Sequence, residues 1–259
     1  MAETNGEAEV AGRAVAIERT LQLRINPRQV AVFFLRIVAV LTVINCVEIF
    51  FYFYLDDASV YGLVDLFDFA IEGNIPTFYS AVAILFCSAL LALISHANWQ
   101  RPDGDRFYWV GLAILFLFLA VDEAVAIHEA VGDYFEQFFD ASGFLYYMWV
   151  LPYGIATIVL GLVFLKFLWN LPRSTRARFI EAGAIFVTGA IGMEMLGARE
   201  ADLNGTETVL YCVLYTIEEL LEMLGIVLFI YALLSHLTQD TGRVSLVLEL
   251  PHGEPQQEP

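Results

Sequence analysis

Six long apolar segments constrain this chain more than any other feature. They lie at residues 31–55, 76–97, 107–130, 144–169, 178–199 and 208–236. At about 1.5 Å of rise per helical residue, each is long enough to cross a hydrocarbon core about 30 Å thick. Hydrophobic residues make up 59% of the chain, more than is usual in soluble domains. The sequence therefore predicts an all-α, polytopic integral membrane protein built as a bundle of six transmembrane helices.

The basic residues predict how this bundle is oriented. With six spans, nearly all of them fall on one side of the membrane, the side that carries both termini, and they are depleted on the other. The positive-inside rule places that side in the cytoplasm. We therefore expect a multi-pass protein of the cell (cytoplasmic or inner) membrane with both termini cytoplasmic. The residues on this side are Arg13, Arg19, Arg24, Arg28, Arg101, Arg106, Lys166, Arg173, Arg176, Arg178 and Arg243.

Three parts follow from this topology. Residues 1–29 form a cytoplasmic N-terminal segment, partly disordered, whose arginines lie either on an amphipathic helix or in a basic flank that only sets topology. Residues 30–236 form the six-helix transmembrane domain, and residues 237–259 form a cytoplasmic tail. Residues 244–250 of the tail have the composition of a strand, but no partner for a strand is evident, so we treat them as tail.

Acidic residues interrupt four of the apolar segments. Counted from the cytoplasmic ends, Glu48, Asp122 and Glu194 each lie roughly 9–10 Å below the outer membrane boundary. Glu218 falls at a similar depth and Glu222 lies nearer the midplane. The sequence therefore predicts a layer of carboxylates contributed by four helices in the outer half of the bundle.

These acids have no basic residue at their own depth. Arg36 lies near the cytoplasmic end of its span, and Arg199 lies near the outer end of its span. Ionised carboxylates that share a low-dielectric site are costly unless something compensates their charge. Three solutions stay open: the acids bind metal, they hold and relay protons, or they are protonated and connect helices by hydrogen bonds.

The metal hypothesis assigns a role to each intramembrane acid. Oxygen-rich ligation with one imidazole suits iron, manganese or zinc. Di-iron carboxylate bundles also take their ligands from four helices, although their Glu-x-x-His pattern is absent here. Glu219 and Glu123 remain as candidate catalytic bases. The expected ligands are Glu48, Asp122, His128, Glu129, Glu194, Glu218 and Glu222.

Two local patterns indicate how the helices begin and pack. Asn74 and Pro76 are typical of the start of a helix, as a capping residue and a residue whose missing N–H costs nothing. In the fifth span, Ala184, Thr188 and Gly192 form a small-residue face. Such a face lets a neighbouring helix approach closely, which would bring Glu194 toward the bundle interior.

The leading functional hypothesis is a metal-dependent membrane enzyme that acts on a lipid or another apolar substrate, by metal-activated water or by di-metal oxidation. The alternatives are a proton- or cation-coupled transporter that uses the same acids, and a non-catalytic membrane subunit. The lipid bilayer is the expected partner, and the sequence indicates no nucleic-acid binding. The sequence leaves open whether the protein forms a homo-oligomer.

Overall fold

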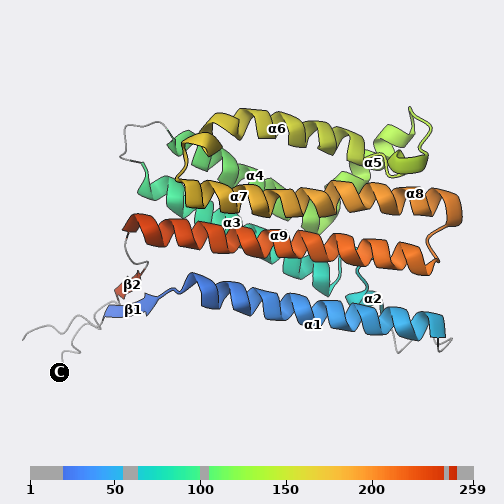
Figure 1. The fold of residues 1–259 in the computed structure, drawn as a ribbon, viewed down its shortest axis with the longest axis horizontal. Helices are drawn as coiled ribbons and strands as arrows, with labels where there is room; N and C mark the ends of the chain where they lie inside the picture. Colours follow the sequence, from blue (N-terminus) through green and yellow to red (C-terminus); the bar gives the residue numbers. More distant parts are fainter. Residues whose placement is uncertain (1–19, 55–63, 100–104, 242–244, 250–259) are drawn as a thin grey trace, which may run out of the picture.

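The structure is a computed structural model that describes residues 20–54, 64–99, 105–241 and 245–249. The described part is helical apart from one pair of short strands (Figure 1). Its elements are β1 (Thr20–Arg24), α1 (Pro27–Tyr54), α2 (Val64–Phe67), α3 (Ile75–Ala97), α4 (Arg106–Val125), α5 (Ile127–Glu136), a 3₁₀ turn (Gly143–Leu145), α6 (Val150–Asn170), α7 (Arg173–Val187), a π-helical turn (Thr188–Met193), α8 (Glu194–Asn204), α9 (Val209–Thr241) and β2 (Ser245–Glu249).

Within the described residues, six helical segments are long and apolar enough to cross a membrane. Five of them are α1, α3, α4, α6 and α9, and the sixth is the continuous run from α7 through the π-helical turn to α8. Many large apolar side chains, such as Phe78 and Leu162, are exposed along these helices. An apolar exterior of this extent is expected where lipid covers the surface. The prediction of a helical fold with six helices long and apolar enough to span a membrane is therefore confirmed.

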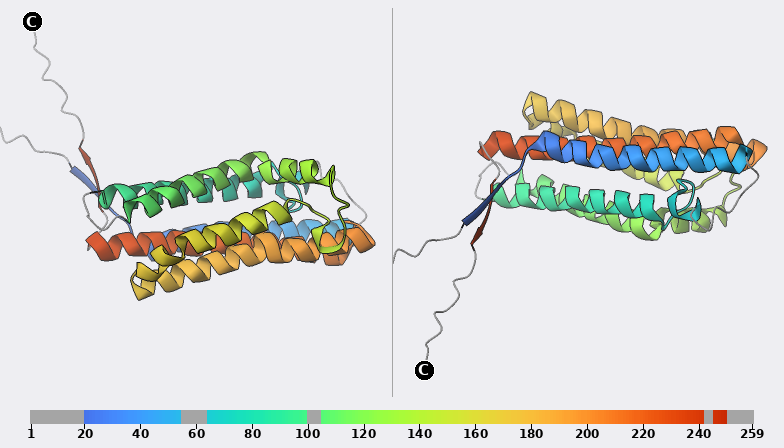
Figure 2. Two further views of the ribbon diagram at one scale, coloured as in Figure 1. Left: turned by 90° about the horizontal axis from the view of Figure 1, so that it is seen from above. Right: turned by 90° about the horizontal axis from the view of Figure 1, so that it is seen from below.

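Helix α9 organises the bundle. It packs against α1, α3, α7 and α8, and α4 packs against α3. Figure 2 shows α3 and α4 as one layer and α1, α9 and α7 as a second layer beside it. Buried apolar side chains of α3, α4, α7 and α9, among them Leu91, Trp109, Ala182 and Ile230, form the larger core of the bundle.

The start of α3 follows the sequence prediction. Asn74 is the capping residue, and its side-chain oxygen accepts a hydrogen bond from the backbone N–H of Thr77 at 3.2 Å. Pro76 lies in the first turn, where no N–H is needed. This cap fixes the chain just after Glu72, a residue that enters the site described below.

Two short strands that are far apart in the sequence pair at one end of the bundle. β1 and β2 pair in antiparallel register, with Thr20 opposite Glu249 and Arg24 opposite Ser245. Residues 20–24 are therefore a strand and not part of an amphipathic helix, whereas residues 1–19 lie outside the described part. Within the strand pattern at residues 244–250, residues 245–249 do have a partner, β1, which lies far away in the sequence. We refer to this end of the bundle as the strand end and to the opposite end, which carries α5, as the acidic end (Figure 1).

Candidate functional site

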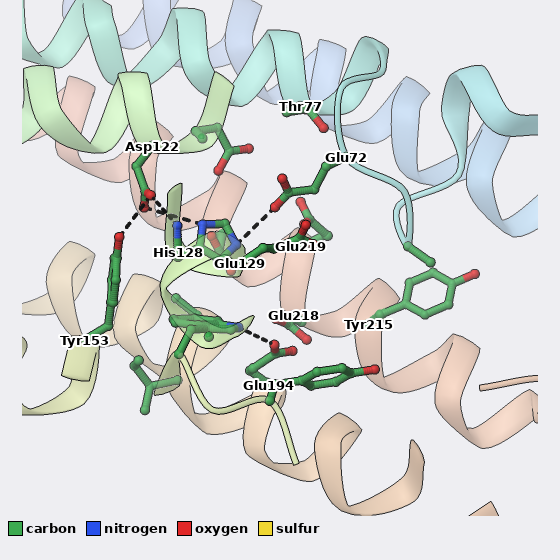
Figure 3. Close-up of a pocket in the computed structure, with 18 of the residues that line it drawn as sticks. Glu72, Thr77, Asp122, His128, Glu129, Tyr153, Glu194, Tyr215, Glu218 and Glu219 are labelled. Carbon is green, nitrogen blue, oxygen red and sulfur yellow. Dashed lines mark hydrogen bonds and ion pairs between the residues drawn. The ribbon is translucent and has the colours of Figure 1, made fainter. Parts of the chain in front are cut away.

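A cavity of about 620 Å³ occupies the acidic end of the bundle. Its lining comes from the α2–α3 connection, α3, α4, α5, the α5–α6 connection, α6, α7, the π-helical turn, α8 and α9 (Figure 3). Ten acidic residues and one histidine contribute to this lining, and among the described residues no lysine or arginine does. The acidic residues are Glu72, Asp122, Glu123, Glu129, Asp133, Glu136, Glu194, Glu218, Glu219 and Glu222.

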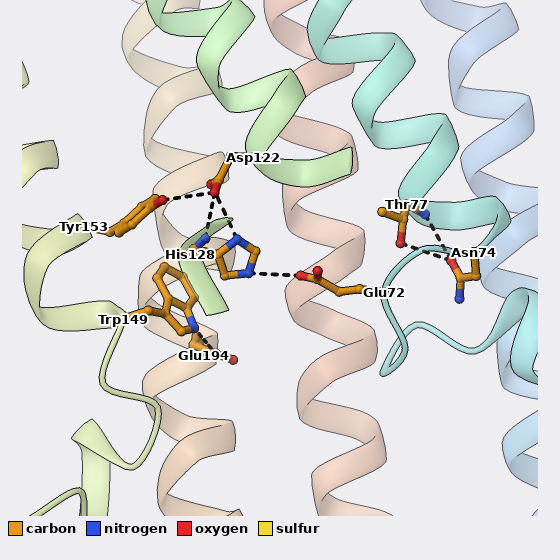
Figure 4. Close-up of polar contacts among 8 residues, drawn as sticks. All are labelled: Glu72, Asn74, Thr77, Asp122, His128, Trp149, Tyr153 and Glu194. Carbon is orange, nitrogen blue, oxygen red and sulfur yellow. Dashed lines mark hydrogen bonds and ion pairs between the residues drawn. The ribbon is translucent and has the colours of Figure 1, made fainter. Parts of the chain in front are cut away.

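His128 lies between two of these carboxylates (Figure 4). Its Nε2 is 3.0 Å from Glu72 Oε1, and its Nδ1 is 3.4 Å from Asp122 Oδ2. Burial lowers the pKa of His128, but the hydrogen bonds and charges of Asp122 and Glu72 outweigh this effect and raise the pKa to about 10. His128 is therefore an imidazolium at neutral pH and compensates part of the negative charge of the cavity.

A break in the helix positions His128. α4 ends at Val125, Ala126 has a left-handed backbone with φ of 54°, and α5 begins at Ile127. Asp122 Oδ1 accepts the backbone N–H of His128 at 2.8 Å, which satisfies a donor in the first turn of α5. The predicted continuous helix through residue 130 is therefore wrong. Because the helix breaks, Asp122 and Glu129 do not share one helical stripe, although both still line the cavity.

Two aromatic side chains at the start of α6 donate hydrogen bonds to acids of the cavity. The hydroxyl of Tyr153 donates to Asp122 Oδ1 at 3.0 Å, and Trp149 Nε1 donates to Glu194 Oε1 at 2.9 Å. The indole of Trp149 also contacts the imidazole of His128 edge to face, with ring centroids 4.8 Å apart. These contacts connect α4, α5, α6 and α8 through one polar network (Figure 4).

Helix α9 supplies the three glutamates at the floor of the cavity, Glu218, Glu219 and Glu222. The carboxyl group of Glu218 lies within hydrogen-bonding reach of that of Glu194. Glu219 also lies close enough to Glu123 and to Glu222 for the like charges of these carboxylates to interact. Glu123, Glu194, Glu218, Glu219 and Glu222 form a group that we call the central glutamates.

A close helix contact brings Glu194 to this group. A Cβ on Gly189, in the π-helical turn, would lie only 2.8 Å from Glu218 O and 3.1 Å from Glu222 N. π-Helical turns rotate the residues that follow them and are frequent at functional sites. Small residues do allow the close approach, as predicted, but the residue that makes it is Gly189. Ala184 and Thr188 of the predicted face are exposed.

Glu48 is the predicted ligand that lies elsewhere. It lines a separate cavity of about 360 Å³ together with Asp68 and Glu207. Tyr211 and Tyr215 line both cavities and lie between them. All other predicted site residues, by contrast, line the 620 Å³ cavity: Asp122, Glu123, His128, Glu129, Glu194, Glu218, Glu219 and Glu222.

The predicted metal site has no preformed ligand set. Within residues 20–54, 64–99, 105–241 and 245–249, no three His, Cys, Asp or Glu side chains are arranged as ligands of one metal ion. Both ring nitrogens of His128 already face carboxylate oxygens. A metal ligand must offer a neutral imidazole nitrogen, so His128 in this arrangement is a poor donor for a metal.

Sequence reasoning missed Glu72, Trp149 and Tyr153. Glu72 belongs to a loop whose acidic residues are typical of a solvated outer surface. In the structure, the turn before the Asn74 cap places Glu72 at the cavity. The two aromatic residues lie where an interfacial belt is expected. Nothing in the spacing of these residues indicates a polar partner on another helix.

Comparison with known proteins places the chain in a family without a described function. No curated protein and no solved structure matches the sequence. The sequence model of one family, described as "Domain of unknown function (DUF8692)", matches residues 31–237, which include all six membrane-length helical segments for most of their length. The chain therefore belongs to the DUF8692 family.

Proposed function

We propose that the chain is a multi-pass protein of the cell membrane whose acidic cavity binds a divalent metal ion, and that this ion serves a reaction on a lipid or another apolar substrate. The observation that carries the proposal is the imbalance of charge: ten acidic residues, one histidine and no described lysine or arginine line the cavity. Such a set of carboxylates within a membrane domain is costly and calls for a compensating cation.

The central glutamates are the proposed ligands. They come from α4, α8 and α9, and their carboxyl oxygens are hard donors of the kind that iron, manganese and zinc accept. Glutamate side chains have three rotatable bonds, so a cation that enters the group can draw several carboxylates to itself. Asp122 and His128, which hold each other, serve to anchor α5 beside this site.

Proton- or cation-coupled transport is the second candidate. The contact between Glu194 and Glu218 favours it, because a hydrogen bond between two carboxyl groups requires one shared proton. Chains of such groups are typical of proton relays. Against it, the acids of the cavity gather toward the end of the bundle that carries α5 instead of extending through it (Figure 1).

Elemental analysis tests the metal proposal. Protein purified in mild detergent without chelator should carry at least one equivalent of iron, manganese or zinc. Glu219→Gln and Glu222→Gln should lose most of it, because each removes a charged ligand and keeps the side-chain shape. Glu48→Gln is the matched control, since Glu48 is also an acid of a membrane-length helix but lines a different cavity.

The outcome separates the two candidates. Metal that is retained by Glu48→Gln and lost by Glu222→Gln supports the proposal. Absence of bound metal, even after reconstitution with each ion, overturns it. In that case proton flux in proteoliposomes, compared between the wild type and Glu218→Gln, becomes the decisive assay.

A further inference from the structure

A second cavity, of about 220 Å³, lies directly beside the acidic one. It is formed by α3, α4, α6, α7 and α9, and every described residue that lines it is apolar or glycine. Ile84, Leu119, Phe186 and Val187 line both cavities, so the two cavities adjoin each other. We call the second cavity the apolar pocket.

Two glycines place the opening of the apolar pocket between α6 and α7. Gly161 on α6 and Gly183 on α7 both line the pocket, and both are exposed. A Cβ built on either glycine would have no heavy atom within 4 Å. In the middle of a helix that crosses the bilayer, an exposed position faces lipid. The pocket therefore opens sideways toward the hydrocarbon region of the membrane.

Contacts at both ends of α6 keep this opening in place. At the acidic end, Tyr153 is bonded to Asp122. At the strand end, the ring of Phe167 stacks on Tyr108 with centroids 5.2 Å apart and meets Trp109 edge to face at 4.9 Å. The helix is thus fixed at its two ends, and its middle section borders the pocket.

We propose that the apolar pocket binds the hydrocarbon chain of a membrane amphiphile, which enters between α6 and α7 and extends an uncharged or cationic head group into the acidic cavity. The position of the head group rests on the proposed function, because it would meet the central glutamates or their ion. The position of the chain rests on the apolar pocket alone.

The volumes of the two cavities and the charge of the acidic cavity favour a ligand of this kind. Ligand pockets are typically about 300–1,000 Å³, a range that includes the acidic cavity at 620 Å³. The apolar pocket, at 220 Å³, is smaller and suits one apolar arm of a ligand. An anionic head group would meet like charge from ten acidic residues, so a neutral or positive head is favoured.

Photo-crosslinking in lipid nanodiscs tests the proposal. The probe is a long-chain fatty alcohol with a diazirine near the end of its chain, and the labelled peptides are identified by mass spectrometry. In the wild type, labelling should concentrate on residues that line the apolar pocket, such as Leu112, Phe164 and Phe179. A fatty acid of the same length should label metal-free protein less, because its carboxylate is repelled.

Filling the pocket should strongly reduce this labelling. Gly161→Leu and Gly183→Leu each place a side chain where there is free space. The hydrocarbon chain of the ligand can then bury fewer methylene groups, and each methylene group that is no longer buried weakens its binding about fourfold. A Leu side chain should therefore reduce pocket labelling at least about tenfold. Gly154→Leu is the matched control: it lies on α6, has no heavy atom within 4 Å of its Cβ, and lines neither cavity.

The outcomes separate this inference from the proposed function. Labelling spread evenly over the exterior of the bundle, or equal labelling of Gly183→Leu and Gly154→Leu, overturns the chain site. Metal content is measured on the same samples. If metal is bound but pocket labelling is absent, only the chain site fails; if labelling is lost in the Leu variants but no metal binds, only the metal proposal fails.

Discussion

At the scale of single residues, counting along the helices predicted most of the acids that line the cavity, but not their hydrogen-bond and ion-pair partners. Counting along helices correctly grouped Asp122 with Glu194 and Glu218, because each residue adds a fixed rise. The same count also grouped Glu48 with these residues. That prediction is wrong, because depth along a helix does not specify toward which neighbouring helices a residue points. The ion pair of His128 with Glu72 depends on a loop that returns to the bundle, which helical spacing does not describe.

His128 gives a prediction for the dependence of stability on pH. Its pKa in the folded protein, about 10, lies above the usual value of 6.5. The stabilisation from its ion pairs is therefore complete below pH 6.5 and is lost as pH rises toward 10. The apparent Tm in detergent should fall between pH 6.5 and pH 9.5 by more in the wild type than in His128→Gln. Equal slopes for the two proteins would contradict this account.

At the scale of elements, the six spans followed from apolar length, but the irregular backbone inside them did not. The break at Ala126 and the π-helical turn at Thr188–Met193 contain no proline, and the order of their residues does not specify either irregularity. Both involve tertiary contacts: Asp122, which caps the helix after the break, also accepts a hydrogen bond from Tyr153 of α6, and the turn packs against α9. Contacts of this kind become visible only when neighbouring helices are placed.

The break at Ala126 predicts how substitutions there behave. A left-handed backbone costs a non-glycine residue about 1–2 kcal/mol, and a β-branched residue fits it worst. Ala126→Val should therefore lower the free energy of unfolding by at least about 1 kcal/mol, whereas Ala126→Gly should leave it unchanged or raise it. Thermal melts followed by circular dichroism measure both. Ala124→Val, at an exposed position in regular helix, is the control and should be nearly neutral.

The π-helical turn predicts a second contrast. Gly189→Ala would bring a methyl group against the backbone of Glu218 and Glu222, so the π-helical turn or α9 must move. Overpacking of this kind costs about 1–3 kcal/mol. Gly192→Ala meets only the methyl group of Thr188 at 3.8 Å and should be tolerated. Thermal melts of the two variants test this, and similar losses of stability in both would show that the close contact at Gly189 is not limiting.

At the scale of the whole molecule, composition and apolar length predicted the class of fold. They did not predict that β1 and β2 pair, because the two strands lie at opposite ends of the sequence and neither has a local partner. Nor did they predict the two adjoining cavities, since their shapes depend on where α6 lies relative to α4 and α7.

The orientation of the bundle is the prediction that belongs to this scale. The arginine-rich strand end should face the cytoplasm and the acidic end should face outward. Asp140→Cys and Ser174→Cys place thiols at exposed positions near opposite ends. In intact cells, a membrane-impermeant maleimide should label Asp140→Cys, and it should label Ser174→Cys only after permeabilisation. The wild type accounts for labelling of its own cysteines, and the reverse pattern would invert the topology.

A manganese titration followed by electron paramagnetic resonance tests the central claim, that the gathered carboxylates form a cation site, most directly. Free Mn²⁺ gives a sharp six-line signal that weakens when the ion is bound, so the titration yields both the number of sites and their affinity. The account predicts saturable binding in the wild type and in Glu48→Gln, and a loss of at least about tenfold in affinity, or about 1.4 kcal/mol, in Glu219→Gln and Glu222→Gln. Binding that is absent from the wild type, or that persists unchanged in both cavity variants, would contradict it.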